Sequence, residues 1–307
     1  MADSSDLPLV SVIMNAHNSS EYLHEAIASV VAQSHRNWEV ILWDNASADD
    51  SEGIAASFGD DRIRYFGIPD KVSLYESRMN AFRQAQGEFV AFLDCDDIWL
   101  PDKLALQLQV FADPDCAFSS TDYITRDERR TIRHRQVTAS RFITYGKPIS
   151  STFELLTDYR VGMSTLMVRR DLALAAWPLY PPGYSIIEDY DMVARLMAGG
   201  FMVPINEALT IYRLHATNFS WRSAVEVEEW SQWLTDLGSL GLSVNEEKVI
   251  RDSVGHQILM LGARTNLLAG RRADVTQAIR QMSSTRDRVK YTAALLLPSP
   301  VAKWIAG

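Results

Sequence analysis

The N-terminal third of the chain alternates between short apolar runs and amphipathic segments. The apolar runs predict strands at Leu9–Met14, Trp38–Trp43, Ile63–Ile68 and Phe89–Leu93. Their length and their β-branched and aromatic content are typical of strands buried on both faces. Between them, apolar residues at helical spacing predict helices at Glu21–Ser34, Ser51–Phe58 and Leu74–Ala85. This repeated strand–helix order predicts an α/β fold, with a mostly parallel sheet flanked by helices.

The pattern becomes less regular after the fourth strand. Further strands are predicted at Cys116–Ile124, Gly162–Arg169, Phe201–Val203 and Ala208–Arg213. Helices are predicted at Ser151–Tyr159 and Met192–Met197. From Val225 onward the spacing is helical throughout, over Val225–Leu237, Asn245–Leu268 and Ala273–Met282. The sequence therefore predicts an α/β region followed by a helical C-terminal region.

Three acids directly follow the fourth strand, in the stretch EFVAFLDCDDIWLPDKL. Asp94, Asp96 and Asp97 occupy three of four positions there. Neighbouring like charges and burial both raise carboxyl pKa values, so the cluster is costly unless a cation compensates it. Hard oxygen ligands suit Mg²⁺ or Mn²⁺, which could also bind phosphates. The alternative interpretation is a solvated acidic turn.

Two more polar clusters follow the first and second strands. They are Asn15–Asn18 and the pair Asp44 and Asn45. Ligands of parallel sheets bind at the carboxyl ends of the strands, which share one edge. The three clusters together predict a nucleotide or sugar-phosphate site built from widely separated residues.

A second acidic cluster lies much later in the chain. Glu188, Asp189 and Asp191 precede a helical segment, where the helix dipole favours an ionised carboxylate. They could equally be ordinary acids of a helix N-terminus. His215 follows the last predicted strand. A lone histidine is more often structural than a ligand, but this position after a strand favours a role in the site.

Composition narrows the class of protein further. The 307 residues are 47% apolar and 22% charged, which is ordinary for a globular protein. The net charge of −9 argues against a nucleic-acid partner, which usually requires a basic face. The only cysteines are Cys95 and Cys116, too few for a disulfide framework. With no signal peptide and no apolar span evident, we expect a cytoplasmic protein.

Two segments leave alternatives open. The arginine-rich stretch Thr125–Thr138 is either a solvated loop or a loop that meets an anionic acceptor or the nucleotide phosphates. The apolar tail Tyr291–Ile305 is either an interfacial anchor, giving peripheral contact with the inner face of the membrane, or a helix docked on the protein.

The order of these motifs resembles family 2 glycosyltransferases, which have the GT-A fold. The resemblance covers about residues 8–220. The matching stretches are VSVIMNAHNSSEYLHEAIASVVAQS, WEVILWDNASADDS, GEFVAFLDCDDIWLPDKL (the DxD motif), IIEDYDMVARL (the ED motif) and ALTIYRLHATNFS. Each motif alone is moderately specific, whereas five in the correct order are highly specific.

The resemblance implies transfer of a sugar from a nucleotide-diphospho-sugar to an acceptor hydroxyl, with inversion at the anomeric carbon. It implies a catalytic domain at residues 1–222, with a donor half at about 8–105 and an acceptor half at about 106–222. Residues 223–307 would be a helical extension that shapes the acceptor side or a homo-oligomer contact. The acceptor would be a sugar, a lipid-linked or a small molecule, in the synthesis of a polysaccharide, glycolipid or other glycoconjugate.

The family pattern also assigns roles on the donor side. It makes Asp96 a direct ligand of Mn²⁺ or Mg²⁺ and places Asp94 at the ribose or the metal. His215 would be a further metal ligand or a pyrophosphate contact. Arg78 matches an arginine that meets the diphosphate or frames the site. The metal would offset the charge of the departing nucleoside diphosphate.

On the acceptor side, the ED motif implies a general base. The matching position is Asp189, suited to take the proton of the attacking hydroxyl. Glu188 and Asp191 would orient the acceptor or Asp189 itself.

Base binding is implied for the ends of the first two strands. Asp44 matches the family's first acid, but the second acid is replaced by Asn45. An amide oxygen can still accept from a pyrimidine N3–H, so UDP or dTDP is favoured over GDP. The usual proline and tyrosine of the opening turn are replaced by Asn15 and His17, which leaves side-chain roles there, and at Asn18, less defined.

Two other classes compete with this reading. A nucleotidyltransferase has a related sheet, but it typically carries a glycine-rich phosphate loop where this chain has Asn15–Asn18. A catalytically silent nucleotide-sugar-binding module would be favoured if the acids were missing, and they are present.

Overall fold

The computed structural model describes residues 7–127, 137–138, 147–157, 159, 161–176, 184–215, 223–269, 271–282, 284, 287 and 290–292. Within the arginine-rich stretch, residues 128–136 lie outside this set, as does the tail from residue 293. The chain divides into two compact units, Met1–Thr217 and Asn218–Gly307, which are described separately below.

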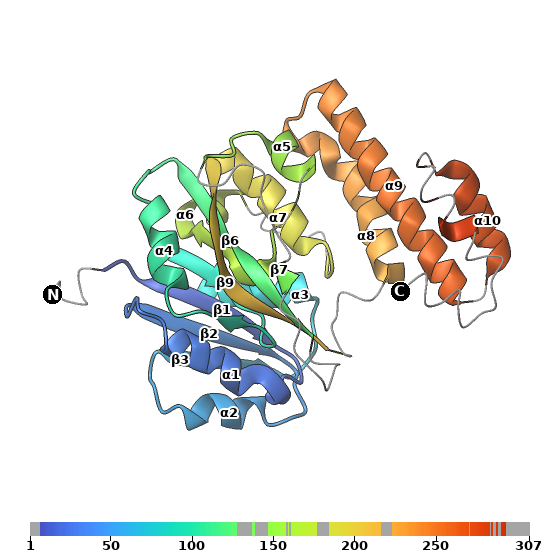
Figure 1. Cartoon of the computed structure of the whole chain (residues 1–307). Coiled ribbons are helices and arrows are strands. Elements are labelled where there is room, and N and C mark those ends of the chain that lie inside the picture. The colour runs from blue at the N-terminus through green and yellow to red at the C-terminus, as the bar shows by residue number, and fades with distance from the viewer. Residues whose placement is uncertain are drawn as a thin grey trace. The chain divides into compact units, whose positions relative to one another are not determined.

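The first unit is built on one mixed sheet (Figure 1). Strands β1 (Val10–Ala16), β2 (Trp38–Asn45), β3 (Ile63–Ile68) and β4 (Phe89–Phe92) are mutually parallel, as predicted. The full order is β3-β2-β1-β4-β8-β6-β9-β5, with β7 paired to β6. The added strands are β5 (Ile98–Trp99), β6 (Cys116–Asp127), β7 (Val137–Thr138), β8 (Leu166–Arg169) and β9 (Phe201–Leu214).

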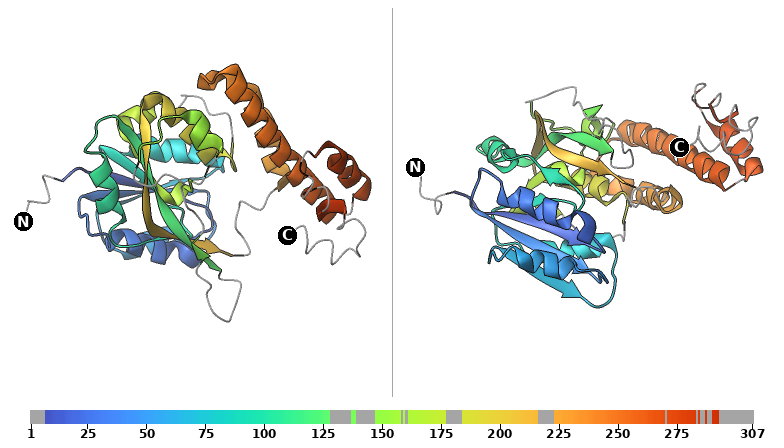
Figure 2. Two further views of the ribbon diagram at one scale, coloured as in Figure 1. Left: turned by 45° about the horizontal axis from the view of Figure 1, so that its top comes forward. Right: turned by 60° about the horizontal axis from the view of Figure 1, so that its bottom comes forward.

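Helices flank both faces of this sheet (Figures 1 and 2). Alternate residues of β1 enter two separate cores, with Val12 in one and Ile13 in the other. The core around Val12 includes residues of α1 (Ser20–Val31), α2 (Ser51–Ser57) and α4 (Lys103–Val110). The core around Ile13 includes residues of α3 (Leu74–Gln84), α5 (Thr152–Thr157), α6 (Arg170–Ala176) and α7 (Glu188–Leu196). The α/β prediction is confirmed.

Several boundaries differ from the predicted ones. The two strands predicted at Phe201–Val203 and Ala208–Arg213 form one strand, β9, which stays paired with β6 through shifts of register. The predicted strand Gly162–Arg169 begins instead as a 3-10 turn, Met163–Thr165, and only then enters β8. Neither the register shifts nor the 3-10 turn produces a repeating pattern of apolar residues, so the sequence pattern could not predict them.

The second unit is helical, as predicted. Its helices are α8 (Ser223–Asp236), α9 (Val244–Leu268) and α10 (Arg272–Gln281), and α9 packs against both others. Ser243 and Glu246 form a capping box at the start of α9, which satisfies backbone N–H groups there. None of the helices in the described ranges is long and apolar enough to cross a bilayer.

Gly87 allows β4 to lie against β1. A Cβ atom at this position would lie 2.6 Å from the Leu9 carbonyl oxygen and 2.7 Å from the Ser11 nitrogen. The Gly87 N–H also donates to the Ser11 hydroxyl at 2.8 Å. Because the obstructing atoms are backbone atoms of the neighbouring strand, they cannot move aside without disturbing the sheet.

We expect Gly87→Ala to destabilise the protein by about 1–3 kcal/mol, since overpacking a buried site costs that much. Gly255→Ala is the matched control, because nothing lies within 4 Å of its added Cβ in helix α9. That substitution should be neutral or stabilising by up to about 1 kcal/mol. Urea unfolding measures the stability of both variants. An unchanged free energy of unfolding in Gly87→Ala would show that β4 does not depend on the close approach of Gly87 to the β1 backbone.

Candidate active site

The polar clusters lie where the parallel strands end. Ala16 at the end of β1 pairs with Asp44 of β2, and Ile13 of β1 pairs with Phe92 of β4. The Leu93 N–H then donates to the Ile13 carbonyl, which carries the chain into the DxD turn beside the end of β1. The predicted shared edge is therefore present.

A tight turn brings three aspartates together after β4. The Asp97 N–H donates to the Asp94 carbonyl at 3.0 Å. Burial, and next the negative charge of Asp94, raise the pKa of Asp96. Asp97 is almost wholly buried, and burial together with the charges of Asp96 and Asp94 raises its pKa well above the usual range. The electrostatic cost inferred from the sequence is confirmed in direction for both residues.

His215 contacts this turn from the end of β9. Its Nε2 lies 2.9 Å from Asp96 Oδ2. Strand β5 places it there, because Ile98 pairs with Ile211 and so holds the end of β9 beside the DxD turn. The Tyr22 ring of α1 packs on the imidazole at a centroid distance of 4.9 Å. The predicted association of Asp96 with His215 therefore appears in the structure.

Arg78 connects this turn to the ED motif. From α3, its Nη2 donates to Asp94 Oδ1 at 2.8 Å, and its Nη1 contacts Glu188 Oε1. Arg78 and Glu188 are each only 5% exposed. The DxD and ED carboxylates, far apart in sequence, thus lie on either side of one guanidinium.

Asp189 follows Glu188 in the first turn of α7. Its Oδ1 accepts a hydrogen bond from the Tyr190 N–H at 2.8 Å. Burial is the main cause that raises the pKa of Asp189, the charge of Asp94 adds to it, and the resulting pKa is about 6. The Tyr190 N–H, the Arg78 charge and the Tyr159 hydroxyl act in the opposite direction. A carboxyl with a pKa near neutral is suited to proton transfer.

Asp191 lies in a different environment from its neighbours in the motif. Its side chain is completely buried, and Oδ2 accepts from Arg195 Nε at 2.9 Å, one turn along α7. This ion pair fixes Asp191 within the helix. The predicted support of Asp189 or of the acceptor by Asp191 stays a prediction.

The two residues at the end of β2 bind the protein's own loops. Asp44 accepts from the Ser47 N–H at 2.8 Å and from the Tyr65 hydroxyl at 2.9 Å. The Asn45 side chain makes two 2.9 Å hydrogen bonds with the backbone of Val72, one to its carbonyl and one from its N–H. The amide of Asn45, predicted to meet a pyrimidine, is therefore engaged in holding the loop before α3.

The predicted residues of the opening turn connect the end of β1 to α3 and to the end of β2. The Asn15 amide donates to the Ser77 hydroxyl at 2.8 Å, and His17 Nδ1 lies 2.8 Å from the Asn45 carbonyl. Asn18 has a φ of 54° and accepts from the Ala48 N–H through Oδ1. His17 and Asn18 are exposed at this edge.

Ser164 was missed by sequence reasoning. Its hydroxyl accepts from the Asp94 N–H at 3.1 Å, and its carbonyl accepts from Trp99 Nε1 and the Thr210 hydroxyl. Ser164 therefore holds the DxD turn in place through hydrogen bonds on both sides of it, to Asp94 and to Trp99. Ser164 lies in a stretch predicted as a strand and has no local signal, because its partners come from distant parts of the chain.

The predicted metal ligands are only partly assembled. Asp96 and His215 are in contact, whereas Asp94 is paired with Arg78. No group of three or more histidine, cysteine or acidic side chains in the described part of the chain is arranged to hold a metal ion. The oxygen donors suit Mg²⁺ or Mn²⁺. Arg78 contacts Asp94 through Oδ1, so the second carboxylate oxygen of Asp94 could ligate a cation while the ion pair stays in place.

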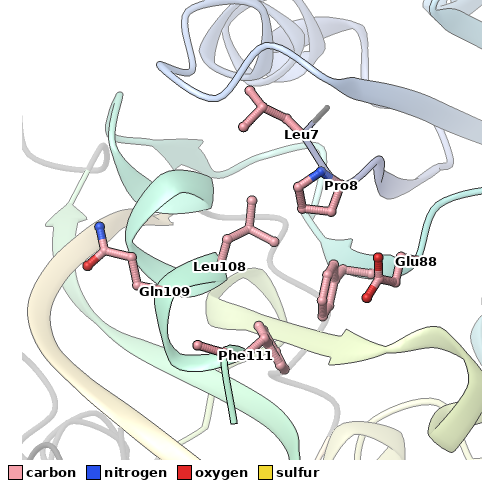
Figure 3. Close-up of a pocket in the computed structure, with 8 residues that line it drawn as sticks. Leu7, Pro8, Glu88, Leu108, Gln109 and Phe111 are labelled. Carbon is pink, nitrogen blue, oxygen red and sulfur yellow. The ribbon is translucent and has the colours of Figure 1, made fainter. Parts of the chain in front are cut away.

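A surface hollow of about 390 Å³ lies away from these residues (Figure 3). Leu7, Pro8, Phe89 and Phe111 contribute to its lining, with Glu88 as its one carboxylate. These residues lie where β1 and β4 begin, at the opposite end of the strands from the DxD turn. The hollow therefore has no part in the acidic site.

Sequence comparison places the chain in a known class. The sequence model of glycosyl transferase family 2 matches residues 11–173. The chain therefore belongs to glycosyl transferase family 2, and the predicted resemblance is confirmed. The family defines the protein as a glycosyltransferase.

Two bacterial relatives are similar over most of their length. TuaG of Bacillus subtilis, described as a glycosyltransferase of teichuronic acid biosynthesis, is 31% identical over 71% of this chain and 84% of its own. WfgD of Escherichia coli, a UDP-Glc:α-D-GlcNAc-diphosphoundecaprenol β-1,3-glucosyltransferase, is 28% identical over 73% of this chain and 84% of its own.

Solved structures share the fold. Residues 1–349 of TarS from S. aureus, in complex with UDP-GlcNAc, superpose with a TM-score of 0.64 at 15% identity, over 97% of this chain and 88% of that one. The mannosyltransferase PcManGT of Pyrobaculum calidifontis, in complex with GDP-Man and Mn²⁺, gives 0.58 at 15% identity, over 99% of this chain and 85% of that one. The predicted GT-A architecture is confirmed by this likeness.

The environment of Asp189 generates a pH prediction. If this carboxylate accepts the acceptor's proton, only its ionised form is active, and that form is lost as the pH falls through about 6. We expect kcat/KM to be level above about pH 7 and to fall about tenfold per pH unit below 6. A rate profile between pH 4.5 and 8.5 measures this. A fall in kcat/KM centred near pH 4 would show that the group being titrated is a carboxyl with an ordinary pKa.

Proposed function

We propose that the protein transfers a sugar from a nucleotide-diphospho-sugar to an acceptor hydroxyl with inversion at the anomeric carbon. One observation supports this above all others. Arg78 touches both Asp94 of the DxD turn and Glu188, the neighbour of Asp189. A phosphate-side acid cluster and a candidate base therefore share one site, as a single displacement requires.

Asp189 is the proposed general base. Its carboxylate takes the proton of the acceptor hydroxyl while that oxygen bonds to the anomeric carbon and the bond from this carbon to the diphosphate oxygen breaks. The negative charge thus moves from Asp189 to the leaving nucleoside diphosphate. A pKa of about 6 leaves the base ionised at neutral pH yet basic enough to accept the proton.

Asp94, Asp96 and His215 are the proposed residues of the diphosphate end. A bound Mn²⁺ or Mg²⁺ would supply positive charge for the departing diphosphate. The raised pKa of Asp96 supports a cation there, because a cation removes the cost of neighbouring buried charges. Mn²⁺ in the related mannosyltransferase fold is consistent with this proposal.

The base and ribose of the donor are proposed to lie at the ends of β1 and β2. The exposed His17 and Asn18 would be the nearest side chains, with Asn15, Asp44 and Asn45 shaping the surface beneath them. UDP is favoured over GDP, with dTDP as the alternative. UDP-sugars are named for WfgD and TarS, although GDP-Man is named for the mannosyltransferase.

The proposed acceptor is a sugar hydroxyl of a growing surface polysaccharide, either free or lipid-linked. Its support is the similarity to TuaG and WfgD, whose names refer to teichuronic acid and to a diphosphoundecaprenol acceptor. We assign residues 1–222 to the catalytic domain and 223–307 to a helical extension. The compact units Met1–Thr217 and Asn218–Gly307 support a boundary near this position.

The metal proposal is tested by calorimetric titration of UDP, dTDP and GDP with Mn²⁺ or with a chelator. We expect UDP to bind most tightly and at least about tenfold more tightly with Mn²⁺, because a cation held by the acids would supply positive charge at the diphosphate. Asp96→Ala should remove this Mn²⁺ dependence. Equal affinity of the unsubstituted protein with and without the metal would contradict it.

The base proposal is tested by Asp189→Asn. We expect transfer from a UDP-sugar to fall about 10²- to 10⁴-fold, while UDP affinity stays nearly unchanged. Asp171→Asn is the matched control, because exposed Asp171 also accepts from the next backbone N–H, at 2.9 Å, in the first turn of α6. Full turnover by Asp189→Asn would remove this residue from the base role. Binding without turnover by the unsubstituted protein, across acceptors, would indicate a silent module.

A further inference from the structure

Arg78 is a buried cation held between two acids from different parts of the chain. It extends from α3, with Nη2 donating to Asp94 and Nη1 in contact with Glu188. Its exposure of 5% leaves little surface for solvent to compensate its charge. An arginine cannot lose its proton at accessible pH, so these carboxylates are what make its burial tolerable.

The fixed geometry of the Arg78 guanidinium constrains where its two carboxylate partners can lie. Its N–H groups form a rigid planar fork, so two carboxylates bound to different arms are held at a set separation and angle. A lysine ammonium has a single nitrogen on a flexible stem and imposes no such spacing.

Each of the two carboxylates leads directly to a residue of the proposed reaction. Asp94 begins the turn that contains Asp96, and the Ser164 hydroxyl accepts from its N–H. Glu188 begins α7 and directly precedes Asp189. A displacement of Arg78 would therefore shift the two clusters relative to one another.

We propose that Arg78 is a positioning residue that fixes the separation of the diphosphate-side acids and the general base, and that Glu188 acts through Arg78 and not on the acceptor. This inference rests on the proposed function. The sequence left two alternatives for each residue: Arg78 as a diphosphate contact or as a frame for the site, and Glu188 orienting the acceptor or Asp189. The inference chooses the second alternative for Arg78 and gives Glu188 a route of action through Arg78.

The charges around Asp189 are consistent with this role. The groups that act on its carboxyl are the Tyr190 N–H, Arg78, Asp94 and the Tyr159 hydroxyl. Arg78 lowers the pKa of Asp189, whereas Asp94 raises it. Loss of the guanidinium charge should therefore move the acidic limb of the rate profile to higher pH.

The test compares Glu188→Gln, Arg78→Met and the double variant in the full chain, with UDP affinity, kcat and acceptor KM measured for each. We expect Glu188→Gln to lower kcat about ten- to hundredfold, the cost of a small misplacement of reacting groups. Its acceptor KM and UDP affinity should stay within about twofold. In the Arg78→Met background, the added Glu188→Gln change should alter kcat by no more than about twofold, because its only route of action is gone.

A matched control is Arg64→Met. Arg64 Nη1 also makes a 2.8 Å ion pair with a buried acid, Glu39, but in the β2–β3 part of the sheet, outside the site. Its kcat should equal that of the unsubstituted protein. Where Arg78→Met folds poorly, Arg78→Lys keeps the charge without the fork and should show the same loss of kcat with normal UDP affinity.

Three results would overturn the inference. One is a rise in acceptor KM on Glu188→Gln that persists with Arg78 replaced, which would place Glu188 on the acceptor. Another is a loss of UDP affinity with normal kcat in Arg78→Lys, which would make Arg78 a diphosphate ligand. The last is a further large fall in kcat when Glu188→Gln is added to Arg78→Met, which would give Glu188 a route of action that does not pass through Arg78.

Failure of the proposed function would look different. The unsubstituted protein would then turn over no nucleotide-sugar, whether or not it bound one. Urea unfolding still tests the Arg78–Glu188 contact in that case. Arg78→Met leaves Glu188 buried without its cation, so the double variant should unfold at a higher urea midpoint than Arg78→Met alone. An equal or lower midpoint would contradict the Arg78–Glu188 contact itself.

Discussion

Repulsion between crowded carboxylates, of which Asp97 is buried and Asp94 and Asp96 are partly exposed, is the constraint around which the first unit is arranged. Three aspartates occupy the turn after β4, and the pKa values of Asp96 and Asp97 are raised by burial and by their neighbours. The protein offsets part of this cost with Arg78 at Asp94, His215 at Asp96 and the Arg213 N–H at Asp97. The remainder favours binding of a cation and the phosphates it carries.

The topology of the sheet explains how these partners meet. Parallel strands β1, β2 and β4 end at one edge, and β5 folds back against β9 so that His215 arrives at the same turn. Helix α3 delivers Arg78, and α7 delivers Glu188 and Asp189. None of these elements would form the site alone. Function therefore depends on the register of the sheet as much as on the acids themselves.

The sequence was sufficient to predict the four parallel strands, their flanking helices and the acidic clusters, because periodicity and strand-end chemistry are local. It was not sufficient to predict that Asn45 binds the Val72 backbone, that Ser164 supports Asp94, or that Arg78 joins two acidic motifs. Those contacts link residues far apart in the chain. The family resemblance identified Arg78 as part of the site, but only its partners in the structure indicate what it does there.

The most direct measurement is a crystal structure of the protein with UDP and Mn²⁺. The metal should bind Asp96 and the diphosphate oxygens at the carboxyl ends of β1, β2 and β4. Asp189 should face the bound diphosphate, on the side from which an acceptor would approach the sugar. UDP bound elsewhere, such as in the hollow beside Phe89, or Asp189 facing away from the diphosphate, would contradict the shared acidic site.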